Sequence, residues 1–121
     1  MEARDFVEQT LYPALNRYFC QWAEQQEAPF VLYESALIFE KGLEDMFDAV
    51  IMVSASEATR LRRVMLRDNC SEAAVRARMA NQWCEADKLD RADYVIYHEH
   101  DDEDGYLFEQ VKAVVAGIEG V

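Results

Sequence analysis

Short apolar segments alternate with amphipathic segments along this chain, and that alternation restricts the folds it can adopt. Three segments, residues 30–33, 49–53 and 94–97, predict buried strands. The second is uniformly apolar, which is typical of a parallel strand covered on both faces. Strands that alternate with helices indicate βαβ units. The pattern therefore predicts an α/β fold, with a parallel sheet flanked by helices.

Apolar periodicity and capping residues mark the helices, which we expect over residues 3–26, 54–67, 71–83 and 106–116. Pro13 interrupts the first, so either a second helix begins there or one helix bends. A capping-box pattern at residues 54–57 opens the second helix, and Ser71 caps the third. The second and third helices, with only a few residues between them, predict a helical hairpin.

The acidic composition limits the partners of the whole chain. With 24 acidic and 12 basic residues among 121, the formal net charge is −12. A surface of this charge repels nucleic acid and anionic membranes, so we expect neither as a partner. The length fits one domain, which we assign to residues 1–121. Half of the basic residues nevertheless gather in one stretch: Arg60, Arg62, Arg63, Arg67, Arg76 and Arg78.

The cysteines and the beginning of the chain bear on location. Cys20, Cys70 and Cys84 are odd in number and lack a C-x-x-C spacing, which favours reduced thiols. The first residues are polar, unlike a signal peptide, and no apolar run approaches the length of a membrane span. We therefore expect a cytoplasmic protein.

A phosphate-binding loop of the form G-x-x-x-x-G-K-S/T does not occur in the sequence. None of the four glycines, Gly42, Gly105, Gly117 and Gly120, is followed by Lys-Ser or Lys-Thr. Such a loop supplies the backbone N–H groups that hold the β- and γ-phosphates of a nucleotide. We therefore expect no ATP turnover by this chain alone.

Several short segments, taken in order, nevertheless resemble one kinase family. Residues 36–43, Ala-Leu-Ile-Phe-Glu-Lys-Gly-Leu, resemble the P-L-L-F-E-x-G-L stretch of dephospho-CoA kinases. Residues 11–13 are similar to that family's L-H-P, and residues 71–82 to its S-x-x-x-x-x-x-R-x-x-x-Q. Residues 88–96 are similar to K-x-x-x-A-D-x-V-I. The chain departs from the family at Tyr12, Ala36 and His98, where His, Pro and Asn are usual.

The resemblance implies ATP- and Mg²⁺-dependent phosphorylation of the ribose 3′-hydroxyl of dephospho-CoA. In that family the phosphate-binding loop and a catalytic Asp precede the region matched here. We therefore expect the C-terminal portion of such an enzyme, with a helical substrate-side segment at about 1–28 and the sheet and lid at about 29–121. The family's strand order, 2-3-1-4-5, implies that the Walker strand is missing between residues 30–33 and 49–53. We expect that gap to be filled by closure of the sheet, by dimerisation or strand exchange, or by the amino-terminal half.

The resemblance also suggests site residues. Arg67 and Arg78 match lid arginines that stabilise the transferring phosphoryl group in catalysis, although without the resemblance a solvated helix face is the simpler interpretation. His98 lies where the family contacts adenine. The two histidines of residues 98–100 suggest an ordinary surface loop more than a metal site. The candidate substrate-side residues are Tyr12, Glu34, Phe39, Glu40 and Lys88.

Two of these assignments have structural alternatives. Glu34 and Glu40 flank the loop after the first predicted strand, where carboxylates often face a ligand, but Glu40 fits a turn cap equally well. Lys88 fits either a ligand contact or an ordinary exposed lysine. Two other functions also remain open for the whole chain: a non-catalytic binding or regulatory module, and a nucleotide kinase with another acceptor.

Overall fold

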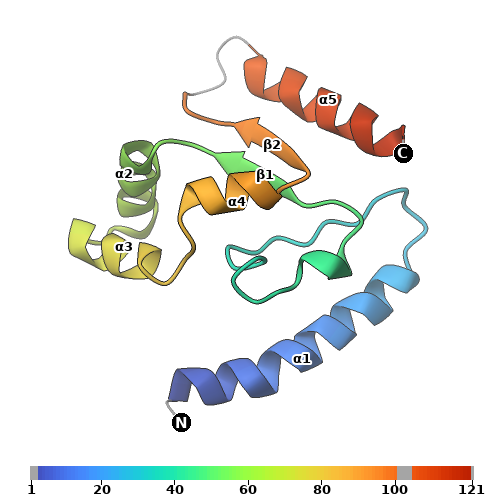
Figure 1. The fold of residues 1–121 in the computed structure, drawn as a ribbon, viewed down its shortest axis with the longest axis horizontal. Helices are drawn as coiled ribbons and strands as arrows, with labels where there is room; N and C mark the ends of the chain where they lie inside the picture. The colour runs from blue at the N-terminus through green and yellow to red at the C-terminus, as the bar shows by residue number, and fades with distance from the viewer. Residues whose placement is uncertain (1–2, 101–104, 121) are drawn as a thin grey trace. The chain divides into compact units, whose positions relative to one another are not determined.

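A computed structural model describes residues 3–100 and 105–120 (Figure 1). The chain divides into two compact units, Met1–Glu34 and Ser35–Val121. The predicted acidic turn at residues 101–104 lies outside the described residues.

The first unit is built on one long helix, α1 (Ala3–Glu24), which continues through Pro13. The alternative of a second helix beginning at Pro13 is therefore wrong. Near the end of α1, the Phe19 ring packs edge-on against Tyr33 with 4.8 Å between ring centroids. This contact holds the segment that follows the helix against its last turns.

Residues 30–33 form an extended loop in the structure, so the predicted first strand is wrong. A strand is defined by pairing with a neighbour, and no strand among the described residues pairs with this segment. Leu32 is 83% exposed, although the composition of the segment suits a sheet interior. The apolar composition of residues 30–33 is typical of a strand. A strand also needs a neighbour to pair with, and composition does not reveal whether one is present.

The second unit contains a parallel sheet of two strands, β1 (Ile51–Ser54) and β2 (Tyr94–Tyr97). Ser54 is paired with Tyr97, so both strands end at the same edge. The side chain of Asp93 fixes the opposite end, because its Oδ2 accepts a hydrogen bond from the Val50 N–H at 2.8 Å. The predicted parallel sheet and the predicted strand at 94–97 are confirmed. The strand predicted at 49–53 begins two residues later, as β1.

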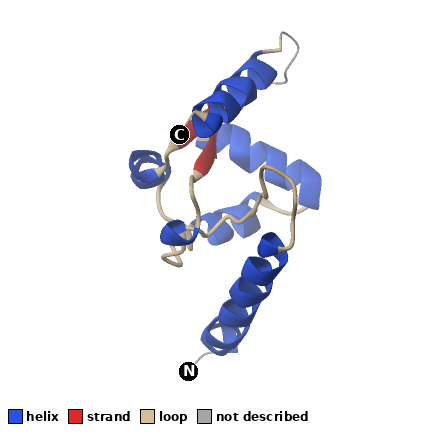
Figure 2. Ribbon diagram, turned by 90° about the vertical axis from the view of Figure 1, so that its right-hand side faces the viewer, coloured by secondary structure: helices blue, strands red, loops and turns tan. Residues whose placement is uncertain are grey.

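Helices surround this sheet (Figures 1 and 2). A hairpin of α2 (Glu57–Asp68) and α3 (Glu72–Met79) follows β1, and Asn69 turns the chain in the left-handed region at φ 50°. Ser71 caps α3 as predicted, but Ser56 rather than Ser54 caps α2, because the Ser56 hydroxyl accepts from the Thr59 N–H. A 3-10 turn, η1 (Glu44–Met46), precedes the sheet, α4 (Glu85–Arg91) lies against β1, and α5 (Tyr106–Glu119) lies along β2.

The free edge of β2 is closed by a side chain of α5. The Gln110 amide accepts from the Tyr97 N–H and donates to the Tyr97 carbonyl, both at 2.8 Å. Gly117 allows α5 to approach closely, since a Cβ there would lie 2.9 Å from the Tyr94 ring. The other edge of β1 has no strand partner among the described residues.

The core of the second unit is small. Its buried apolar side chains come from β2, the residues flanking β1, the hairpin, α5 and the loop before η1: Phe39, Val50, Ala55, Leu61, Val75, Ile96 and Val114. None of the described helices combines the length and apolar character needed to cross a bilayer.

Candidate functional site

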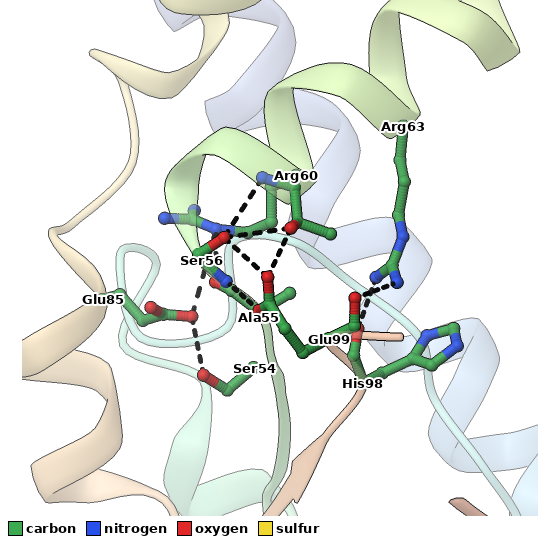
Figure 3. A network of polar contacts seen from close by, with 9 residues as sticks. Ser54, Ala55, Ser56, Arg60, Arg63, Glu85, His98 and Glu99 are labelled. Atoms are coloured by element: carbon green, nitrogen blue, oxygen red, sulfur yellow. Dashed lines mark hydrogen bonds and ion pairs between the residues drawn. The ribbon is translucent and has the colours of Figure 1, made fainter. Parts of the chain in front are cut away.

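The carboxyl ends of β1 and β2, which lie side by side at one end of the sheet, carry a network of polar contacts (Figure 3). In open parallel α/β sheets this edge is where ligands bind. The Ser54 hydroxyl donates to Glu85 Oε1 at 3.0 Å, which joins β1 to the start of α4. Arg60 Nε donates to the Ala55 carbonyl at 3.1 Å, so α2 is tied back to the same edge.

Glu99, just beyond β2, occupies the amino-terminal end of α2. One carboxylate oxygen accepts from the Ser56 N–H at 2.6 Å, and the other accepts from the Ser56 hydroxyl at 2.8 Å and from the Thr59 hydroxyl. These donors stabilise the charged form, with the Thr59 contact contributing most, and lower the pKa of Glu99 to about 2. A carboxylate of the chain itself therefore fills this helix terminus.

Arg63 holds the same segment from the helix side. Its guanidinium donates to the His98 carbonyl at 2.5 Å and to the Glu99 carbonyl at 3.1 Å. The His98 N–H donates to the Ser54 carbonyl at 2.8 Å. The backbone of His98, the expected adenine-end residue, is thus held from two sides, of which Figure 3 shows the contacts of Arg63.

The two expected lid arginines meet at the turn of the α2–α3 hairpin. Asp68 Oδ2 accepts from Arg67 Nη2 at 3.1 Å and from Arg78 Nη1 at 2.8 Å, while Oδ1 accepts from Arg67 Nε at 2.8 Å. Hydrogen bonds from Arg67 and then Arg78 hold the pKa of Asp68 well below its usual range, and the Asp68 contact raises the pKa of Arg67. Two guanidinium groups from different helices thus converge on one acceptor oxygen.

The arginine-rich stretch is therefore not one open basic patch. Arg60 and Arg63 tie α2 to the sheet edge, whereas Arg76 pairs with Glu72 at 3.0 Å and with Glu57 at 2.9 Å. Arg62 and Arg76 border a shallow hollow of about 610 Å³ that is also lined by Leu61, Met65 and Leu66. None of the predicted site residues lines that hollow.

Glu40 and Lys88 form a buried ion pair in the second unit. Glu40 Oε2 lies 2.8 Å from Lys88 Nζ, and the side chains are only 7% and 13% exposed. Lys88 also donates to the Ala36 carbonyl at 3.2 Å, and the Trp83 N–H donates to Glu40 Oε2 at 3.3 Å. Lys88 is thus not an ordinary exposed lysine.

Aromatic and charged groups surround this pair. Phe39 stacks on Trp83 with 6.4 Å between ring centroids, and the Arg91 guanidinium lies over the Trp83 ring at 4.7 Å from its centroid. The structure therefore places Phe39, Glu40 and Lys88, three of the five predicted substrate-side residues, in one group. Tyr12 lies on α1 and Glu34 ends the first unit, so this group within the second unit includes neither.

Four residues of these sites were not among the candidates predicted from the sequence: Arg63, Asp68, Trp83 and Glu99. Asp68 directly follows Arg67 in the sequence, which is a local signal, whereas nothing local connects Glu99 with a helix start more than 40 residues away. No group of three or more His, Cys, Asp or Glu side chains able to hold a metal ion occurs within residues 3–100 and 105–120.

Comparisons with known proteins identify the family. Residues 1–104 match the family model of dephospho-CoA kinase. The chain is 40% identical over 119 residues to a dephospho-CoA kinase of Syntrophotalea carbinolica, a match that covers 95% of this chain and 54% of that protein. It is 35% identical over 114 residues to a dephospho-CoA kinase of Thermus thermophilus, a match that covers 94% of this chain and 55% of that protein.

A solved structure agrees with the sequence matches. The crystal structure of TT1252 from Thermus thermophilus matches with a TM-score of 0.81 at 34% identity, covering 93% of this chain and 58% of that one. This likeness confirms the predicted α/β, P-loop-kinase-like fold for the part that the chain contains. The chain spans about half the length of the curated relatives it matches. It belongs to the dephospho-CoA kinase family.

Proposed function

We propose that the protein containing this chain transfers the γ-phosphoryl group of ATP to the ribose 3′-hydroxyl of dephospho-CoA, the last step of coenzyme A synthesis. This chain contributes the lid hairpin and part of the substrate side. Family membership supports the reaction. The observation that carries the chain's own role is the convergence of Arg67 and Arg78 on one oxygen of Asp68.

The two arginines suit a phosphoryl group in transfer. Such a group carries negative charge on its equatorial oxygens, and guanidinium forks donate to oxygens of that kind in pairs. Because Arg67 and Arg78 come from different arms of the hairpin, one movement of the hairpin brings both to the same phosphate. Their stabilisation acts mainly in the transition state, where the charge is spread most widely.

The phosphates of the nucleotide are the groups to which the Arg67 and Arg78 guanidinium groups would donate. ATP supplies the transferable group, and Mg²⁺ neutralises part of its charge when bound. The described residues offer no cluster of ligands for that ion, so we assign Mg²⁺ to no residue of this chain. His98, whose backbone is held at the carboxyl edge, is the proposed contact at the adenine end.

We assign the substrate side to Tyr12, Glu34, Phe39, Glu40 and Lys88. Within this set, the Glu40–Lys88 ion pair connects the loop before η1 to α4. We infer that the pair positions the Phe39 loop for the substrate, in addition to any direct contact. Both side chains are largely removed from water, so the pair is favourable only in good geometry, and it thereby favours one position of the loop relative to α4.

The chain alone is expected not to turn over ATP. It lacks the G-x-x-x-x-G-K-S/T loop that positions nucleotide phosphates, so the lid arginines have no bound substrate to act on. Purified chain incubated with ATP, Mg²⁺ and dephospho-CoA should form no coenzyme A above a no-protein control. Protein-dependent product would contradict this expectation.

The lid assignment is tested in a chimera that joins this chain to the amino-terminal part of the Syntrophotalea carbinolica enzyme. We expect Arg67→Ala and Arg78→Ala each to lower kcat/KM. The loss of transition-state stabilisation calculated from that decrease should be about 2–4 kcal/mol. Arg76→Ala is the matched control, because Arg76 lies on the same hairpin but pairs with Glu57 and Glu72. Activity of either lid variant within about twofold of the parent refutes the assignment.

A further inference from the structure

Asp68 occupies the point at which the two lid arginines meet. Its carboxylate accepts three hydrogen bonds, two from Arg67 and one from Arg78, and Oδ2 is shared between the arms. Asp68 ends α2, and the left-handed residue Asn69 together with the Ser71 cap begins the return into α3. The short turn therefore fixes this carboxylate relative to both helices.

The guanidinium groups that hold Asp68 are open to solvent. The Arg67 and Arg78 side chains are 72% and 56% exposed, so a dissolved anion can reach both. A carboxylate and a phosphoryl group offer guanidinium forks the same arrangement of acceptor oxygens. Asp68 thus makes with both arginines the contacts that a phosphate would make.

We propose that Asp68 is a built-in competitor of the phosphate: its carboxylate occupies the place between Arg67 and Arg78 that phosphoryl oxygens take, and a polyphosphate has to displace it. The proposal rests on the proposed function, since it concerns the same two arginines. It adds a regulation of the lid, which pairs with itself when no phosphate is present and releases the arginines when one arrives.

Two effects of Asp68 on anion binding oppose each other. The carboxylate gathers the arginines, which favours binding, and it repels an incoming anion, which disfavours binding. Exposed ion pairs contribute little individually, so the gathering effect is small. The repulsion grows with the charge of the anion and acts at contact distance, where salt screens it least. For a multiply charged phosphate, competition therefore outweighs gathering.

The test uses the 121-residue chain and inorganic tripolyphosphate at low salt, with binding followed through the NMR signals of the arginine Nε–H groups. We expect Asp68→Asn to bind tripolyphosphate about fivefold more tightly than the parent chain. Glu72→Gln is the matched control: it makes the same change in net charge on the same hairpin, but its partner is Arg76. This control should stay within about twofold of the parent.

The parent chain gives a second measurement without any substitution. If tripolyphosphate displaces the carboxylate, the Asp68 ¹³Cγ signal must move with the same midpoint as the Arg67 and Arg78 Nε–H signals. A ¹³Cγ signal that stays fixed while those N–H signals move overturns the proposal, even if Asp68→Asn disturbs the hairpin.

Further outcomes separate this proposal from the proposed function. Equal or weaker binding by Asp68→Asn, or an equal gain in Glu72→Gln, overturns the competitor role alone, provided that Arg67→Ala and Arg78→Ala weaken binding. If the two alanine variants bind as the parent does, or if the parent and Asp68→Asn both fail to bind, these arginines bind no polyphosphate in this chain and the competitor role is overturned. The lid assignment is decided separately by kcat/KM of Arg67→Ala and Arg78→Ala in the chimera, where the phosphate-binding loop is present.

Discussion

Glu99 connects segments that lie far apart in the sequence, since its partners Ser56 and Thr59 precede it by 43 and 40 residues. A carboxylate at a helix amino terminus is favourable because it accepts hydrogen bonds from groups left without partners in the first turn. Here the carboxylate belongs to the segment after β2. One residue therefore fixes both the start of α2 and the path of the chain beyond the sheet.

Glu99 should make the stability of the chain depend on acid. Its pKa is lowered from 4.5 to about 2 in the fold, so the unfolded chain takes up a proton at higher pH than the native one. The contribution of Glu99 is present in full above pH 4.5 and is lost as the pH falls to about 2. Glu99→Gln should lower the melting temperature at pH 7, and the difference from the parent should shrink through that window.

Glu109→Gln is the control for this series, because Glu109 pairs with Lys112 on the surface of α5, away from the start of α2. Melting followed by circular dichroism between pH 7 and about pH 2 is the measurement. A difference between Glu99→Gln and the parent that is constant with pH would show that the carboxylate charge is not what stabilises the helix start.

Between elements, the Glu40–Lys88 pair links the loop before η1 to α4. Replacing one member leaves the other buried without its partner, and Glu40 Oε1 already lacks a hydrogen-bond partner among the described residues. We expect Lys88→Met to lower the free energy of unfolding by about 3–5 kcal/mol. The double variant Glu40→Leu, Lys88→Met should recover most of that loss. Urea unfolding of the parent, the two single variants and the double variant measures the coupling, and additive losses contradict a paired role.

How far the sequence predicted these elements depends on how local each signal is. The strand at 94–97 and the Ser71 cap were predicted correctly, because apolar composition and a capping serine act over a few residues. The strand at 30–33 was wrong, because pairing depends on a neighbour that no local pattern reveals. The same limit explains the arginines: sequence showed that they cluster, but only the fold shows Arg63 bound to the sheet edge and Arg67 and Arg78 bound to Asp68.

At the scale of the whole molecule, one edge of β1 has no strand partner among the described residues, which predicts that this chain associates with itself when studied alone. A two-stranded sheet is marginal, and residues 51–54 contain no Lys or Pro that would block pairing. The net charge of −12 opposes contact, but salt screens it over about 8–10 Å. Sedimentation equilibrium should therefore show dimers that strengthen with added salt. A 14.0 kDa monomer at all concentrations contradicts this prediction.

The Gln110 amide should limit this self-association to dimers, because it occupies the outer side of β2. It binds the Tyr97 backbone as a further strand would, so β2 offers no free edge at that residue. Gln110→Ala should release this edge and produce species larger than a dimer in the same centrifuge runs. Unchanged dimers in that variant would show that other parts of α5 close the edge.

Within residues 3–100 and 105–120, β1 offers one edge to which a further strand can pair, so the chain resembles a polymer unit with a single reactive end. Two copies that meet through β1 use up both of their ends, because the amide of α5 has already terminated the other side of each sheet. Growth then stops at a pair, and the stacking of copy upon copy that leads to fibrils has no second surface from which to continue. Gln110 thereby keeps the assembly at a dimer and prevents unlimited growth.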